Sequence, residues 1–350
     1  MIRQETKKEL LSKVKSLYPY YKNIAVLRKN SLKEILDKNC NDIKISNESN
    51  SCYLDSLLVA LFNDNNEMIQ KMFLETKLKD TDAKLIKIAE EIRHELISIY
   101  DIIQKGNKKF YCKNLRRLFH NYYIHKRTIT KMEKKDWIKD QLEPLDVLNL
   151  LQEMFEIKSK TKYSLKTYGA NNKKDKKIVR DNTITDNNFI SNIEMEQMKN
   201  EKLMLKTIYP KYTDNVLFDP TNLWKPTSKV SYKYKITIKK YLAGDFLFIY
   251  ANRKTINYAT GDNIKLDTKI IPEIKMKLKD NKFNIYLRSM IIHHGGAEGG
   301  HYTTIYECKG LWYEYDDMKS NTKNLIGTFE DVCKKNNSYY LKNLTNLVYY

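Results

Sequence analysis

The chain has 350 residues, of which 41% are hydrophobic, and 63 basic against 43 acidic residues give it a formal net charge of +20. This hydrophobic content predicts a folded protein with a sizeable core, and no apolar run approaches the roughly 18 residues that a membrane span needs. The basic charge raises the question of nucleic-acid binding. The lysines, however, are spread along the whole chain among acidic and apolar residues, which favours a solvated basic surface.

The cysteines are scattered, odd in number and without a Cys-x-x-Cys pair, which argues against a disulfide framework and a structural zinc site. No standard zinc site has the spacing of His293, His294, His301 and Asp316, so we expect no metal and no cofactor. Residues 1–9 contain no apolar signal core. We therefore expect an intracellular protein of the cytoplasm or nucleus, or of a host cell or virion if the source is viral.

In chain order, the first half of the sequence predicts helices. Two amphipathic helices are expected over 6–18 and 31–39, ahead of a leucine-rich helix that begins near Cys52. Further helices are expected over 65–78, 81–104, 113–121 and 143–156. Together, the helices between 50 and 157 predict a helical lobe.

The second half of the sequence predicts strands. A polar, turn-rich stretch over 168–189 comes first, and part of it is expected to be a mobile hairpin or loop. Beyond residue 190, strands are expected over 229–241, 246–250, 283–293, 301–308, 311–316 and 346–350, with a short helix within 320–337.

Cys52 is a candidate nucleophile. Asn47, Ser49 and Asn50 favour a turn before it, and the leucines after it recur at helical spacing, so Cys52 lies at or just inside a helix N-terminus. Unpaired amide groups and the helix macrodipole stabilise a thiolate there. The alternative is a cysteine that only packs at the start of an amphipathic helix. Partners elsewhere in the chain must decide between the two.

Such partners are found near the C-terminus. His301 opens one predicted strand and Asp316 ends the next, and Lys309 and Gly310 join the two strands by a tight turn. In an antiparallel pair these positions lie close together, so the carboxylate can orient the imidazole. A cysteine at a helix start, with a histidine and an aspartate from a distant hairpin, is the layout of papain-like thiol chemistry.

The motifs around these residues resemble those of the ubiquitin-specific proteases. The Cys motif of that family, approximately Asn-x-Gly-Asn-Thr-Cys-Tyr-(Met/Leu)-Asn-Ser, is matched by Asn47, Asn50, Cys52, Tyr53, Leu54 and Ser56. The His motif is matched by Leu287, His293, Gly295, Gly300, His301, Tyr302, Trp312, Asp316 and Asp317. A third motif, Gln-x-Asp-Ala-x-Glu-Phe-Leu, is matched more loosely by Gln141, Glu143, Asp146 and Leu148.

This resemblance implies a role for each matching residue. Cys52 would be the nucleophile, His301 the general base and Asp316 the residue that orients it. Asn47 would be the oxyanion donor and Asp317 a second acidic residue beside the triad. The channel that grips the arginine-containing C-terminal tail of ubiquitin would be lined by Gln141, Glu143, Asp146 and Tyr302. The implied reaction is hydrolysis of the peptide or isopeptide bond after the C-terminal glycine of ubiquitin.

The resemblance also implies the fold: a papain-like α+β cysteine protease with a helical lobe facing an antiparallel β lobe. Many family members carry zinc-binding Cys-x-x-Cys pairs in a fingers region, and their absence here predicts a reduced one. We expect an N-terminal helical extension over 1–44 and a catalytic domain over 45–350. Within that domain we expect the helical lobe over about 45–160, a variable polar insertion over about 168–189 and the β lobe over about 190–350.

The sequence departs from the family motifs at several positions. Ser49 stands where the family has a glycine, so the loop must be arranged differently if that position needs a positive φ. Asp55 replaces a common asparagine, Glu143 an aspartate, Pro144 an alanine and Asp146 a glutamate. Pro144 suits the first position of a helix. None of these changes removes a catalytic group, so we expect an active enzyme.

The expected partners are ubiquitin and ubiquitinated proteins, bound by a monomer that engages neither a membrane nor nucleic acid. Two alternatives remain open. One is a protease for another ubiquitin-like modifier with the same chemistry. The other is a non-catalytic ubiquitin- or nucleic-acid-binding protein on the same fold.

Overall fold

The computed structural model describes the fold through most of the chain. The described residues are 6–9, 12, 43–64, 66, 69–106, 109–130, 135–157, 161–170, 177–186, 190–193, 202–204, 213–218, 233–242, 246–256, 260–277, 284–334 and 338–350. Of the strands between 161 and 242, only the backbone is described. The helix expected over 31–39 lies outside the described residues. The one expected over 6–18 is described only at residues 6–9 and 12, where 7–9 and 12 are helical.

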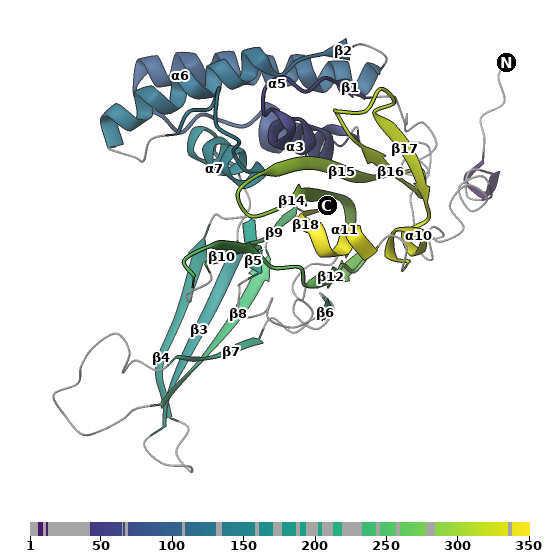
Figure 1. Cartoon of the computed structure of the whole chain (residues 1–350). Helices are drawn as coiled ribbons and strands as arrows, with labels where there is room; N and C mark the ends of the chain where they lie inside the picture. Colours follow the sequence, from purple (N-terminus) through teal and green to yellow (C-terminus); the bar gives the residue numbers. More distant parts are fainter. Residues whose placement is uncertain are drawn as a thin grey trace.

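Four α-helices form one layer of the molecule (Figure 1). They are α3 (Cys52–Phe62), α5 (Ala83–Lys105), α6 (Lys113–Thr130) and α7 (Pro144–Met154). Helix α5 begins at Asp82, whose side chain accepts hydrogen bonds from the backbone N–H groups of Lys84 and Leu85. Helix α7 begins with Pro144 directly after Glu143, in the position where a proline lacks no needed donor. The helical lobe predicted between 50 and 157 is therefore confirmed.

The helix expected over 65–78 is wrong in extent. Among the described residues of that range, Ile69 is helical and is followed by the π-helical turn η2 (Gln70–Leu74), and residues 75–78 are not helical. The chain then leaves the helix because its backbone pairs with the end of α7. The N–H of Lys79 donates to Met154 O, and the N–H of Glu156 donates to Lys77 O. Conversely, the helix expected over 113–121 continues to Thr130.

A mixed sheet of eight strands forms the second layer. Its order is β17-β16-β15-β14-β18-β9-β5, with β13 also paired to β14, and only β5 runs parallel to its neighbour. The strands are β5 (Ile190–Ile193), β9 (Leu247–Ala251), β13 (Lys275–Lys277), β14 (Asn284–Gly295), β15 (Gly300–Cys308), β16 (Leu311–Tyr315), β17 (Lys323–Gly327) and β18 (Leu344–Tyr349). The turn between β15 and β16 has a positive φ at both Lys309 (53°) and Gly310 (77°), as a tight hairpin requires.

Helix α3 lies between the other helices and the sheet, and all eleven of its residues are buried. Two sheet side chains hold its backbone: Thr304 Oγ1 donates to Ser56 O at 2.6 Å, and Ser289 Oγ donates to Ala60 O at 2.7 Å. The opposite face of the sheet packs against Val332 of α10 (Phe329–Cys333) and Tyr340 of α11 (Ser338–Asn343). The start of α3 is thereby fixed against the sheet.

A second, antiparallel sheet has the order β4-β3-β8-β7 and extends away from these layers (Figure 1). It comprises β3 (Thr161–Ala170), β4 (Lys177–Asp186), β7 (Thr213–Phe218) and β8 (Lys233–Leu242). Of the hairpin or loop expected over 168–189, the hairpin is found. It belongs to a four-stranded sheet. The strand expected over 229–241 corresponds to β8, whereas the many lysine, threonine and other polar residues of β3 and β4 resembled a polar loop in the sequence.

Short strands complete the described structure: β1 (Lys44–Ile45) beside β2 (Lys109–Phe110), β10 (Lys254–Ile256) beside β11 (Asn263–Lys265), and β6 (Lys202–Met204) beside β12 (Lys269–Ile271). Cys52, Cys112 and Cys333 are free, whereas Cys308 is disulfide-bonded. The spacing of the cysteines did not predict that pairing, because spacing does not reveal which thiols the fold brings together. Within the described residues, no helix is long and apolar enough to cross a membrane.

Candidate active site

Cys52 is the first residue of α3, and only 3% of it is exposed. The loop before it turns sharply, with a positive φ at Ser49 (45°) and Asn50 (63°). The backbone position where the family motif has glycine is thus left-handed in this chain, and a serine occupies it. Ser51 closes the loop, since its hydroxyl accepts a hydrogen bond from the N–H of Glu48 at 2.9 Å.

Arg116 of α6 holds this loop in place by hydrogen bonds. Its buried guanidinium donates to the carbonyl oxygens of Glu48 at 2.7 Å and Ser49 at 2.6 Å. It also donates to the carbonyl oxygen of Trp137 at 3.1 Å, in the segment that leads to Gln141. Sequence reasoning missed this residue, because a single arginine in a basic helix gives no signal that distinguishes it from surface charge.

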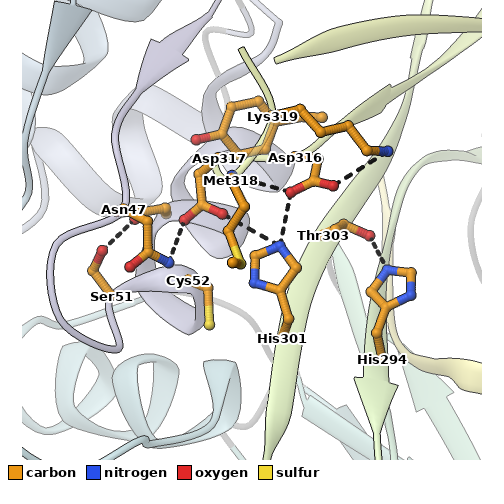
Figure 2. A network of polar contacts seen from close by, with 12 residues as sticks. Asn47, Ser51, Cys52, His294, His301, Thr303, Asp316, Asp317, Met318 and Lys319 are labelled. Carbon is orange, nitrogen blue, oxygen red and sulfur yellow. Dashed lines mark hydrogen bonds and ion pairs between the residues drawn. The ribbon is translucent and has the colours of Figure 1, made fainter. Parts of the chain in front are cut away.

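The predicted hairpin brings His301 and two carboxylates together (Figure 2). His301 Nε2 lies 2.8 Å from Asp316 Oδ1 and 3.4 Å from Asp317 Oδ1. Asp316 is held in turn by the N–H of Met318 at 3.1 Å and by Lys319 Nζ at 3.2 Å. With Nε2 engaged by Asp316, the other ring nitrogen remains for Cys52, which lies next to His301 in Figure 2.

His301 and Asp316 stabilise each other's charged forms. Burial lowers the pKa of His301, but the hydrogen bond with Asp316 and the interaction with Cys52 outweigh burial and raise that pKa to about 10. Burial raises the pKa of Asp316, but the hydrogen bond with His301 and the N–H of Met318 lower it to about 2. At neutral pH the pair is therefore an imidazolium and a carboxylate.

Asn47, the predicted oxyanion donor, lies beside Cys52 in Figure 2. Its Nδ2 donates to Asp317 Oδ2 at 3.0 Å. Because a side-chain amide carries two hydrogens on its nitrogen, one remains for a further acceptor. Asp317 thus links Asn47 to His301, which gives this second acidic residue a defined place in the site.

Gln141, in the segment before α7, lies next to Cys52 and Gly300. Its Nε2 is 3.9 Å from Cys52 Sγ and donates to the carbonyl oxygen of Gly300, whose N–H lies 3.3 Å from Gln141 Oε1. A Cβ on Gly300 would meet His294 O at 1.9 Å, so only glycine fits where the loop returns into β15. The structure thus brings the predicted nucleophile, the predicted base, two acids and both side-chain amides to one place.

A protein-family model described as "Ubiquitin carboxyl-terminal hydrolase" matches residues 43–341. The chain belongs to this family. It therefore shares the papain-like α+β fold of a family of deubiquitinating cysteine peptidases, which confirms the resemblance read from the motifs. No curated protein matches the chain.

In this hydrolase, three of the four residues predicted to line the tail channel lie at two cavities. Glu143 and Tyr302 line a narrow one together with Tyr250, Lys254 and His293. Burial, followed by the charge of Lys265, lowers the pKa of His293 to about 3, so this imidazole is neutral. Asp146 instead lines a second cavity of about 320 Å³, between α6 and α7, beside Lys135 and Trp137.

Both acidic residues predicted for the tail channel are paired within the chain. Glu143 Oε1 lies 2.6 Å from Lys254 Nζ, and Glu143 Oε2 accepts a hydrogen bond from Tyr250 at 2.6 Å. Asp146 Oδ1 lies 2.5 Å from Lys135 Nζ, and its other oxygen accepts from the N–H of Glu143. The third motif includes both acidic residues, but the sequence does not indicate that Lys254 and Lys135 pair with them.

His294 is a further neighbour of the base that the sequence analysis assigned no role. Its ring stacks on that of His301, with ring centroids 6.1 Å apart, and its Nε2 lies 2.7 Å from Thr303 Oγ1. Among the described residues, the group whose metal-ligating atoms come together is His301, Asp316 and Asp317. The hydrogen bond of His301 with Asp316 and its ion pair with Asp317 account for the short distances between these atoms.

Proposed function

We propose that this chain is a deubiquitinating cysteine protease that hydrolyses the peptide or isopeptide bond after the C-terminal glycine of ubiquitin. One observation carries the proposal: in a chain of this family, the hydrogen-bonded pair of His301 and Asp316 faces Cys52 at the start of a buried helix. A nucleophile, a base and a group that orients the base are the requirements of acyl transfer through a thioester.

The first step is attack on the carbonyl carbon. In the starting state the proton of Cys52 resides on His301, and this imidazolium, stabilised by Asp316, lies beside the thiolate. The thiolate sulfur bonds to the carbonyl carbon, and the carbonyl oxygen becomes an oxyanion. The backbone N–H at the start of α3 and the second hydrogen of the Asn47 amide are the donors that stabilise it.

The second step releases the two products. His301 gives its proton to the leaving amine as the carbon–nitrogen bond breaks, which leaves ubiquitin bound to Cys52 as a thioester. Water then attacks the thioester while His301 accepts a proton from it. Collapse of this second tetrahedral intermediate expels the Cys52 thiolate beside the imidazolium, and ubiquitin leaves with a C-terminal carboxyl group that gives its proton to solvent.

Substrate binding is proposed to follow the residues of the third motif. Gln141 and Gly300 contact each other across the entrance to Cys52, so a substrate tail must separate them to reach the sulfur. Beyond them, Glu143 and Tyr302 line the narrow cavity. The two glycines at the end of the tail need little room for side chains, and carboxylates along its path suit arginine side chains.

The test is hydrolysis of ubiquitin that carries a fluorogenic amide at its C-terminus, compared with the same amide on other ubiquitin-like modifiers. We expect turnover of the ubiquitin substrate by the wild type and none by Cys52→Ala. The matched control is Cys333→Ala, which removes another free cysteine, on α10, and should retain full activity.

Other outcomes separate the alternatives. Turnover of a different modifier only would keep the mechanism and replace the substrate. A folded protein without turnover of any modifier would contradict the proposal and favour a docking role. Salt-sensitive binding to DNA or RNA, as tight as that to ubiquitin, would favour a nucleic-acid partner.

A further inference from the structure

A buried carboxyl group lies directly behind the catalytic residues. Asp55, one turn after Cys52 in α3, is 0% exposed, and it stands where the family commonly has an asparagine. Its Oδ2 accepts a hydrogen bond from Ser51 Oγ at 2.5 Å. It neighbours the Asp317 carboxyl group, whose side chain is likewise 0% exposed.

One oxygen of each carboxyl group has no hydrogen-bond donor. Among the described residues, neither Asp55 Oδ1 nor Asp317 Oδ1 has a hydrogen-bond partner, although both atoms are buried. His301 Nε2 forms its hydrogen bond with Asp316. Asn47 donates to Asp317 Oδ2, not to Oδ1. Two adjacent buried acceptors without donors are costly, and a proton between them satisfies both.

We propose that Asp55 and Asp317 share one proton at neutral pH, that Asp55 carries it as an O–H group that donates to Asp317, and that Asp55 thereby positions Asn47 and His301. With this bond, the ionised Asp317 has a fixed orientation, in which it accepts from Asn47 and faces the imidazolium. Asp55 touches no substrate, so it is a positioning residue. Its effect on turnover rests on the function proposed above, whereas the shared proton does not.

The surroundings of the pair favour the protonated form. Burial, and next the charge of Asp317, raises the pKa of Asp55 well above its ordinary value. Cys112, just before α6, and Tyr315 from β16 also face Asp55, and burial raises the pKa of each, so both are neutral there. Tyr53 on the same helix is neutral for the same reason.

Two cationic side chains lie near the pair and its neighbours, Arg116 beside Cys112 and Tyr53, and His301 beside Asp317, and neither donates to the two unpaired oxygens. The guanidinium of Arg116 donates to backbone carbonyl oxygens of the loop before Cys52. The imidazolium of His301 is directed to Asp316. The thiol of Cys112 interacts with Asp55 but is only a weak donor. Among the described residues, proton sharing between the two carboxyl groups therefore supplies the strong donor that both oxygens lack.

The shared proton is tested by unfolding, without any substrate. Asp55→Asn replaces the O–H donor with an N–H donor of the same shape and removes the titrating group. A folded-state pKa raised above the unfolded value stabilises the fold below the unfolded pKa, and that contribution is lost as pH rises. Between pH 5 and 7, the unfolding equilibrium constant of the wild type, divided by that of Asp55→Asn, should rise about tenfold per pH unit.

Two further variants complete this experiment. Asp317→Asn should give the same slope, because its amide can donate to an ionised Asp55 and the pair then holds no proton. The matched control Asp101→Asn makes the same change on a carboxylate that is 55% exposed, on α5, and should give a flat ratio. A flat ratio for Asp55→Asn would show that the pair holds no proton and would overturn the proposal.

The positioning role is tested by turnover of the ubiquitin amide substrate at pH 7. Asp55→Leu, which fills the space without a donor, should lower kcat at least tenfold with little change in KM. Asp55→Asn should rescue kcat to within about threefold of the wild type. A kcat of Asp55→Leu equal to that of the wild type would overturn the positioning role. If the wild type itself turned over no modifier, the proposed function would fail, while the unfolding ratio would still decide the shared proton.

Discussion

The side-chain amide of Asn47 donates a hydrogen bond to Asp317 at 3.0 Å, joining residues 270 positions apart in the chain. The same carboxyl group lies 3.4 Å from His301 Nε2. Asp317 therefore connects the candidate oxyanion donor in the loop before Cys52 with the candidate base on the sheet. The two halves of the site come from different layers of the fold, and Asp317 contacts a residue of each half.

Replacing Asn47 with alanine should lower kcat by about 10²- to 10³-fold, because one donor to the oxyanion is lost. KM should change little, since the amide acts on a charge that develops only in the transition state. Steady-state kinetics with the ubiquitin amide substrate measures both constants. A rise in KM with kcat preserved would instead assign Asn47 to ground-state binding.

Asp316 and Asp317 should be partly redundant as partners of His301. In Asp316→Ala, Asp317 remains close enough to orient the imidazole, so kcat should fall by about 10²-fold, and in the double alanine variant by about 10⁴-fold. Single and double variants are compared in one kinetic cycle. If Asp316→Ala alone loses as much as the double variant, Asp317 does not act on His301.

The pH dependence of the enzyme should be flat around neutrality and fall on the alkaline side. The pKa of His301 is raised to about 10, so the imidazolium that protonates the leaving amine persists through neutral pH and is lost as pH rises through that value. A profile of kcat/KM from pH 6 to 10.5 measures this limb. In Asp316→Ala, which lacks the hydrogen bond that raises this pKa, the limb should move to lower pH. A wild-type limb centred near pH 7 would contradict the charge state of the pair.

Lys254 should weaken the binding of an arginine-containing tail, because it already neutralises Glu143 at 2.6 Å. Lys254→Ala frees that carboxylate, and we expect kcat/KM for the ubiquitin substrate to rise about two- to fivefold, in line with the worth of a half-exposed ion pair. Lys334→Ala removes a lysine paired with Asp331 on α10 and serves as the control for the loss of one positive charge. Unchanged or lower kcat/KM in Lys254→Ala would show that Glu143 does not bind the tail.

Much of the site could be predicted from the sequence because its chemistry depends on local patterns. The helix start at Cys52 follows from polar residues before a leucine-rich run, and the meeting of His301 with Asp316 follows from hairpin geometry. The structure places both as expected. The family match agrees with the motifs, although the individual site roles remain predictions.

Other features could not be predicted, because they depend on side chains from distant segments. The pairing of Lys254 with Glu143 joins residues far apart in sequence, as do the contacts of Arg116 with the loop before Cys52. The four-stranded sheet was also missed in extent. Lysine and threonine residues on β3 obscure the apolar alternation that marks a strand, and backbone pairing with β4 and β8 supplies what the local pattern lacks.

The most direct test of the account is a reaction with ubiquitin that carries a thiol-reactive electrophile at its C-terminus, followed by peptide mass spectrometry. The account predicts one covalent adduct per chain, located on Cys52, and its loss in Cys52→Ala. Cys333→Ala should react like the wild type. An adduct on another cysteine, or none from the folded wild type, would contradict the claim that Cys52 is the nucleophile of a deubiquitinating enzyme.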